Sequence, residues 1–201
     1  MTARPTIDFW YDFASSYSYL SVMRVAALAE AAGVDVRWRP FLLGPIFAAQ
    51  GWSTSPFNLY PAKGRYMWRD MERLCERRGL SLKRPSPFPQ NSLAAARVAI
   101  AGRDQGWIAD FSRALFAMAF GEGKNIADEA VLTAALRAAD IDPNAAMVAA
   151  RSEEVKGRLR AETELAKSLG VFGAPSFITG DGEIFWGDDR LEHAIGWARG
   201  D

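Results

Sequence analysis

The sequence feature that most constrains the fold is residues 7–20, where an aromatic run of strand type leads into a serine-rich turn. The run contains the strand-favouring residues Ile7, Phe9, Trp10, Tyr11 and Phe13. Ser15, Ser16 and Ser18 follow, and serine is preferred at a helix N-cap because its hydroxyl accepts from a free backbone N–H. Apolar side chains then recur at helical spacing over residues 19–32. The segment predicts a buried strand, a tight turn and a single helix whose positive end can hold an anion.

The rest of the chain predicts two α/β halves separated by helices. Residues 34–41 alternate between apolar and polar, as a half-buried strand does, so the first half is expected to be a right-handed βαβ unit. Helical patterns in the middle of the chain cover residues 45–50, 61–78, 92–104, 107–120, 128–139, 144–149 and 152–169. Short strands at 176–179 and 183–186 flank Gly180-Asp181-Gly182, a hairpin signal, and a last helix covers 189–198.

Composition argues against several functional classes. Of the 201 residues, 49% are hydrophobic, which is enough for a sizeable core. Lys plus Arg and Asp plus Glu each number 24, so the net charge is zero, which argues against a nucleic-acid or polybasic membrane-surface partner. No apolar run reaches the roughly 18 residues that a membrane span needs. The N-terminus lacks the apolar core of a signal peptide.

The cysteine and histidine content predicts a cytoplasmic protein without a metal centre. Cys75 is the only cysteine, so no internal disulfide can form and a reducing compartment is expected. We expect Cys75 to serve as a small apolar filler within the helical region. His193 is the only histidine, so the chain has no Cys/His cluster for zinc.

Four motifs resemble one protein family. They are Asp12-Phe13-Ala14-Ser15-Ser16-Tyr17-Ser18-Tyr19-Leu20, Pro61-Ala62-Lys63-Gly64-Arg65-Tyr66-Met67, Gly170-Val171-Phe172-Gly173-Ala174-Pro175-Ser176 and Trp186-Gly187-Asp188-Asp189-Arg190-Leu191. With the βαβ, helical and ββα order, they resemble the 2-hydroxychromene-2-carboxylate isomerases and kappa-class glutathione transferases. The resemblance implies an α/β fold: a DsbA-type, thioredoxin-like domain over residues 1–44 and 165–201, with an all-helical insertion over residues 45–164. It also implies a homodimer. Ser16 departs from the family, which commonly has proline there.

Ser15 is the predicted catalytic residue. Ser15 and Ser18 lie where a redox relative would have Cys-x-x-Cys, and two serines cannot form a disulfide. A nucleophilic Ser15 needs a base, and the lone His193 in the last helix argues against a Ser–His pair. The hydroxyl can instead donate to an external thiolate, lowering a thiol pKa from about 8.5 by an amount worth about 1.4 kcal/mol per unit. The alternative is that Ser15 is only a helix cap; Ser18 is also expected to be a cap.

The C-terminal motifs supply the expected glutathione site. The resemblance implies that the Ala174-Pro175 bond is cis, that it faces the serine turn, and that the Ala174 backbone pairs with the cysteinyl unit. An ordinary proline at the start of a strand is the alternative. Asp189 and Glu192 fit an acidic capping box, while the resemblance assigns Asp188 and Asp189 to the γ-glutamyl end. Trp186 either walls the pocket or is a core tryptophan.

A second set of residues is expected to contact the other substrate, a small aromatic carboxylic acid or another electrophile. Lys63 matches the family's lysine near the active site and could pair with a carboxylate. Asn91 and Ser92 match a segment that lines the isomerase pocket, although both also fit a helix start. The family places an asparagine in the preceding loop, and either Asn58 or Thr54 fills that role.

These motifs together predict a glutathione-dependent enzyme. The first hypothesis is cis–trans isomerisation of an aromatic acid by a glutathione thiolate that Ser15 stabilises. The second is a kappa-like transferase or peroxidase, which consumes glutathione. The third, from a different class, is a non-catalytic thioredoxin-fold protein that binds a peptide or a small thiol.

Overall fold

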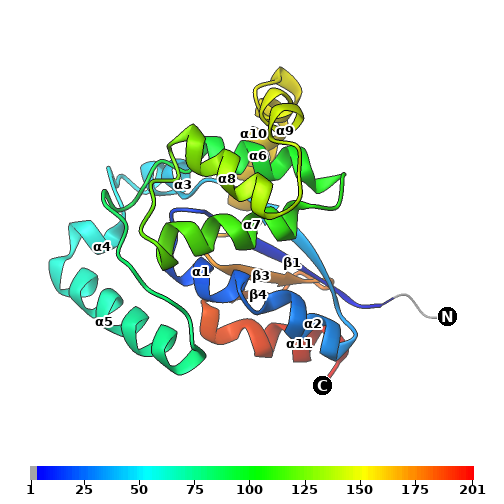
Figure 1. The fold of residues 1–201 in the computed structure, drawn as a ribbon. Coiled ribbons are helices and arrows are strands. Elements are labelled where there is room, and N and C mark those ends of the chain that lie inside the picture. The colour runs from blue at the N-terminus through cyan, green and yellow to red at the C-terminus, as the bar shows by residue number, and fades with distance from the viewer. Residues whose placement is uncertain (1–3) are drawn as a thin grey trace.

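The computed structural model describes residues 4–201, and its centre is a four-stranded mixed sheet with the order β2-β1-β3-β4 (Figure 1). The strands are β1 (Thr6–Tyr11), β2 (Asp35–Pro40), β3 (Ser176–Thr179) and β4 (Ile184–Trp186). β1 runs parallel to β2, with Phe9 opposite Trp38, and antiparallel to β3, with Phe9 opposite Phe177. The predicted βαβ half and hairpin half therefore meet at β1, and the serine turn follows the C-terminal end of that central strand.

The helices follow the predicted order, with small shifts at their ends. They are α1 (Ser16–Val22), α2 (Val25–Ala32), α3 (Leu43–Ala49), α4 (Pro56–Leu59), α5 (Pro61–Arg78), α6 (Leu93–Arg103), α7 (Ile108–Phe116), α8 (Glu129–Ala138), α9 (Pro143–Ala150), α10 (Glu153–Ser168) and α11 (Leu191–Arg199). α4 replaces part of a predicted loop and begins with Pro at its first position, capped by the Ser55 hydroxyl. A π-helical turn at Ala117–Gly121 extends α7.

The single helix expected over residues 19–32 is wrong, because the chain breaks between α1 and α2. Arg24 leaves the helical region (φ −135°, ψ −18°), and its guanidinium bonds to Asp188 and Glu192 near the C-terminus. The Ser21 hydroxyl also donates to Asp188 Oδ1 at 2.9 Å. Long-range polar contacts therefore fix a break that local periodicity does not indicate.

The predicted capping box at the last helix is also wrong. A short 3₁₀ turn, Asp188–Arg190, precedes α11, and the residue at the helix N-cap is Arg190, without a side-chain bond. Glu192 pairs with Arg24 instead of returning to the helix start. Asp189 and Glu192 therefore do not form the capping box that their spacing predicts.

The sheet separates two hydrophobic clusters. Ile7, Phe9 and Tyr11 alternate along β1 and join the larger cluster, which also contains residues of α1, α2, α11 and the helical block. Trp10 faces the other way and packs with Phe41 and with side chains of α3 and α10. No helix in residues 4–201 is both long and apolar enough to cross a membrane.

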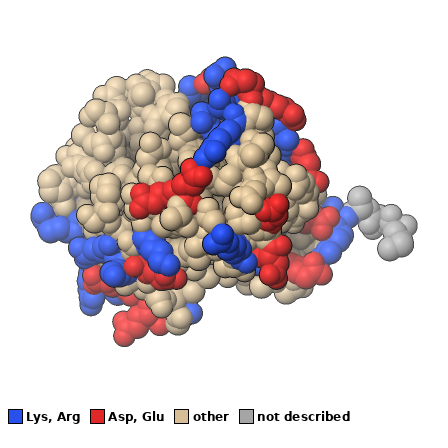
Figure 2. All heavy atoms as spheres, turned by 45° about the horizontal axis from the view of Figure 1, so that its top comes forward, with Lys and Arg blue, Asp and Glu red and all other residues tan. Residues whose placement is uncertain are grey.

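Charged side chains are mixed over the surface. Figure 2 shows basic and acidic residues close together on one face, without a broad area of a single sign. On α5, Arg69 pairs with Glu72 and Arg73 pairs with Asp70 three residues apart. The balanced composition therefore appears on α5 as local ion pairs.

Candidate functional site

A cavity of about 1330 Å³ opens beside the serine turn. Its wall is formed by the start of α1, the segment from Leu42 to Phe57, residues of α5 from Ala62 to Arg78, residues 88–93, and the two C-terminal motifs. Single pockets for one small ligand usually measure about 300–1,000 Å³. The cavity is therefore larger than a pocket for one small ligand usually is.

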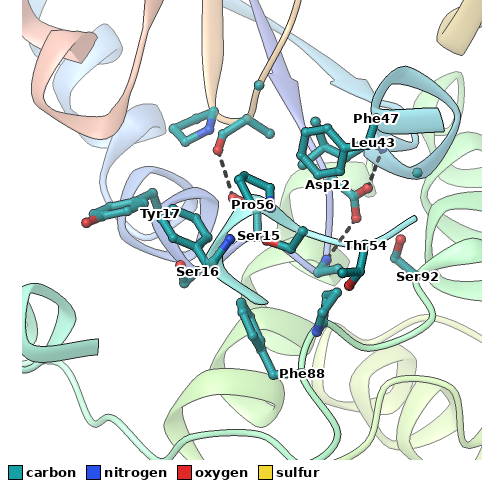
Figure 3. A pocket seen from close by; sticks show the side chains of 18 of the residues that line it. Asp12, Ser15, Ser16, Tyr17, Leu43, Phe47, Thr54, Pro56, Phe88 and Ser92 are labelled. Carbon is teal, nitrogen blue, oxygen red and sulfur yellow. Dashed lines mark hydrogen bonds between the residues drawn. The ribbon is translucent and has the colours of Figure 1, made fainter. Parts of the chain in front are cut away.

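Ser15 lies at the centre of this wall (Figure 3). It is the N-cap of α1, and its Oγ accepts from the Ser18 N–H at 3.2 Å. The same hydroxyl donates to the Ala174 carbonyl oxygen at 2.8 Å, across 159 residues of sequence. Ser15 therefore caps the helix, as the alternative predicted, and it also lines the cavity; its role as a donor to an external thiolate stays a prediction.

The other two serines of the turn, Ser16 and Ser18, are both buried. The prediction that Ser18 is a cap is wrong: Ser18 is fully buried inside α1, and its Oγ has no hydrogen-bond partner in the described part of the chain. Ser16, the position where the family commonly has proline, is also buried and donates to Met67 Sδ at 3.2 Å. Its hydroxyl joins the turn to α5.

Asp12 is a cavity residue to which sequence reasoning assigned no role. Its side chain is 3% exposed, yet it lines the cavity next to Ser15. Oδ1 accepts from the Ala14 N–H at 2.8 Å and Oδ2 from the Leu43 N–H at 2.7 Å (Figure 3). Burial raises the pKa of the Asp12 carboxyl, against the lowering effect of these two N–H groups and the Ser92 hydroxyl. An aspartate between two aromatics, three residues before Ser15, is the signal that could have indicated a role for it.

The Ala174-Pro175 bond is cis, as the resemblance implied, and both residues line the cavity. Trp186 lies beside them and is 53% exposed, so it is a wall residue and not a core tryptophan. Its ring packs on Phe172 with centroids 5.0 Å apart. A Cβ at Gly173 would come within 2.3 Å of the Trp186 indole nitrogen, so glycine is needed for this close approach.

Asp188 and Asp189 are adjacent but have different environments. Asp188 is 4% exposed and its carboxylate bonds to Ser21, Arg24 and Arg78, the last at 2.7 Å. Asp189 has a side chain that is 72% exposed at the cavity edge. Of the two, Asp189 has the accessible carboxylate, which lies 3.4 Å from the Arg190 guanidinium in an exposed ion pair.

Four of the five predicted substrate residues line the cavity, and Asn58 does not. Lys63, Thr54, Asn91 and Ser92 line the cavity, and the Lys63 ammonium lies 4.9 Å from the centroid of the Tyr60 ring. Asn58 is not part of the lining. Its amide donates to Thr54 Oγ1 at 3.3 Å and to the Phe88 carbonyl at 3.0 Å, so it fastens this loop to the segment before α6.

Asn91 also has the local role expected at a helix start, whereas Ser92, the N-cap residue of α6, makes no side-chain capping bond. Asn91 Oδ1 accepts from the Leu93 N–H at 3.0 Å. Ser92 is 7% exposed, and its hydroxyl lowers the pKa of the Asp12 carboxyl against the larger effect of burial.

Cys75 is buried in α5, and burial raises the pKa of its thiol to about 11, so the chain supplies no reactive sulfur to the cavity.

The chain matches one protein-family model over nearly its whole length. That model, described as the DSBA-like thioredoxin domain, covers residues 6–194. The chain belongs to this DSBA-like thioredoxin family. The predicted fold, a thioredoxin-like sheet interrupted by helices, is therefore confirmed.

Relatives within the DSBA-like family include both predicted enzyme groups. The chain is 31% identical to a 2-hydroxychromene-2-carboxylate isomerase of Sphingobium xenophagum, across 93% of this chain and 94% of that protein. It is 25% identical to glutathione S-transferase kappa 2 of Caenorhabditis elegans, across 95% and 90%. A solved 2-hydroxychromene-2-carboxylate isomerase shares 26% identity with a TM-score of 0.86, over 97% of this chain and 94% of that one. The resemblance predicted from the four motifs is confirmed.

Proposed function

We propose that this chain is a glutathione-dependent isomerase similar to the 2-hydroxychromene-2-carboxylate isomerases, acting on a small aromatic carboxylic acid. The observation that carries the proposal is the Ser15 hydroxyl, which faces a large cavity from a helix N-cap while the chain itself brings no thiol there. An O–H donor at this position suits an external sulfur anion. The identity to isomerases over nearly the full chain supports the same assignment.

The cavity residues fit glutathione. Ala174 and Pro175 offer backbone groups beside Ser15, and Trp186 forms an apolar side wall. Asp189 offers an exposed carboxylate to the γ-glutamyl ammonium, while the arginines that hold Asp188 fix the turn that presents it. When bound, glutathione supplies a thiolate that can add reversibly to a conjugated double bond, allowing rotation before it leaves.

The remaining predicted residues of the cavity fit an aromatic acid. Lys63 supplies a cation for the carboxylate, and Thr54, Asn91 and Ser92 supply polar groups among aromatic side chains. Asn58 contributes indirectly, since it fixes the loop that carries Thr54. In this arrangement the protein positions both reactants and stabilises charge on sulfur.

A Ser15→Ala variant tests the proposal. Because a hydrogen bond to a charged group is worth about 1.5–3 kcal/mol, the pKa of the bound glutathione thiol should rise by about one to two units. The pH–rate profile should move with it. Ser16→Ala, which removes the neighbouring hydroxyl that faces Met67, is the matched control and should leave the profile in place. An unchanged pH–rate profile in Ser15→Ala would contradict the assignment of Ser15 as the thiolate donor.

A kappa-like transferase is the second candidate, because the chain also aligns with the Caenorhabditis elegans kappa proteins over 95% of its length. Net loss of glutathione during turnover of an electrophilic aromatic would favour it over the isomerase. Glutathione at 100 times its dissociation constant should stabilise the fold by about 2.7 kcal/mol. Absence of a thermal shift with millimolar glutathione would favour the non-catalytic binding protein.

A further inference from the structure

The Ser15 hydroxyl already has an acceptor for its only proton. Ser15 Oγ accepts from the Ser18 N–H at 3.2 Å and donates to the Ala174 carbonyl at 2.8 Å. A serine hydroxyl carries one hydrogen, so it cannot donate to Ala174 and to a ligand sulfur at once. Donation to a sulfur anion therefore requires that the bond to Ala174 is given up.

The Ala174 carbonyl depends on Ser15, whereas the next carbonyl does not. Pro175 O accepts from the Gly187 N–H at 3.0 Å, a bond internal to the C-terminal motifs. For Ala174 O, the Ser15 hydroxyl is the one donor that the described part of the chain supplies. Ala174 is partly buried in the cavity wall. Turning the Ser15 hydroxyl to a ligand therefore leaves this carbonyl without a protein donor.

A ligand can compensate for this loss only if it brings a donor of its own. A partly buried acceptor that loses its hydrogen bond costs free energy, and this cost offsets part of the gain from the O–H···S⁻ bond. In a cysteinyl amide the N–H and the sulfur belong to the same residue, so both can meet the adjacent Ser15 and Ala174 groups. A simple alkyl thiol has no such N–H.

We propose that Ser15 and Ala174 form an exchange pair, in which the hydroxyl turns to the ligand sulfur when a ligand N–H replaces it on the Ala174 carbonyl. The proposal rests on the proposed function and deepens it. No covalent bond changes: one O–H···O bond is exchanged for an N–H···O bond and an O–H···S⁻ bond. The site thereby activates the thiols of cysteinyl peptides and discriminates against thiols that lack the neighbouring N–H.

The test compares glutathione with its depsipeptide analogue, in which an ester oxygen replaces the cysteinyl N–H. The thiolate of each bound ligand is titrated by its ultraviolet absorbance on the wild-type protein. Relative to each free thiol, bound glutathione should show a downward pKa shift larger by about one unit than the ester. N-acetylcysteine and 3-mercaptopropionate repeat the comparison without the γ-glutamyl arm, and only the former should be activated.

Two controls separate this proposal from the proposed function. In Ser15→Ala the two glutathione analogues should shift equally, because the exchange has no hydroxyl to move. This variant should also bind protonated glutathione at least as tightly as wild type, since the Ala174 carbonyl is already free. Equal shifts on wild type would overturn the exchange pair and leave the thiolate role standing. No shift for glutathione itself would overturn both.

Discussion

Two buried aspartates line the same cavity, and their surroundings differ in kind. Asp12, before α1, accepts from two backbone N–H groups, and none of the ion pairs of residues 4–201 includes it. Asp188, against the far end of α1, is held by the guanidinium groups of Arg24 and Arg78. The Asp12 carboxylate is therefore held by neutral donors, whereas the Asp188 carboxylate is held by two positive charges.

The comparison assigns different tasks to the two carboxylates. Asp188 joins α1, α5 and the turn before α11, so it fixes the relative position of three cavity walls. Asp12 joins the serine turn to the segment after β2, and its main-chain oxygen accepts from the Ser15 N–H at 2.9 Å. Asp188 is therefore a structural clamp, and Asp12 is a positioning residue for Ser15.

Asp188→Ala is the largest expected perturbation. It leaves two partly buried guanidinium groups without their shared carboxylate, and breaking a buried pair costs about 3–5 kcal/mol. Urea denaturation should show this loss in the free energy of unfolding. Asp189→Ala, one residue on and exposed, should change stability by less than about 0.5 kcal/mol while weakening glutathione binding. Similar stability losses in both variants would contradict the clamp.

Asp12→Asn should cost less, about 1–3 kcal/mol, because the amide presents an NH₂ group to one of two backbone donors. Burial raises the folded pKa of Asp12 above its unfolded value of about 3.9. The stabilisation that this carboxyl gives the folded state is therefore complete below that pKa and is lost as pH rises through the folded pKa. The stability gap between wild type and variant should therefore be largest below about pH 4 and shrink as pH rises above it. A gap that is constant or grows with pH would contradict the assignment.

The difference between local and long-range contacts also explains which features the sequence could predict. The strands, most of the helices and the place of Ser15 follow from local patterns, since aromatic runs, serine caps and helical spacing act over a few residues. The break at Arg24 does not, because its cause is an acidic turn 164 residues away. The same long-range pairing removed Glu192 from the expected capping box.

Within the cavity, the sequence indicated which residues line the wall better than it indicated the contacts that each residue makes. Lys63, Thr54, Trp186 and Asp189 line the cavity, whereas Asn58 turns to the Phe88 carbonyl, an acceptor supplied by a distant segment. The sequence did not indicate a role for Asp12, because its surroundings include Leu43 and Ser92, which lie far from it in the sequence.

Glu192→Gln is expected to have a small effect. It tests whether the stability lost on breaking an ion pair depends on the burial of the carboxylate or on its charge alone. Glu192 bonds to the same Arg24 guanidinium as Asp188, but its side chain is 56% exposed. An exposed pair contributes about 0–1 kcal/mol and is screened by salt, so the loss in unfolding free energy should be small and vanish at high ionic strength. In the Asp188→Ala background Glu192 is the remaining partner of Arg24, so the same substitution should cost more there than in wild type. A loss in wild type equal to that of Asp188→Ala would show that burial does not decide the cost.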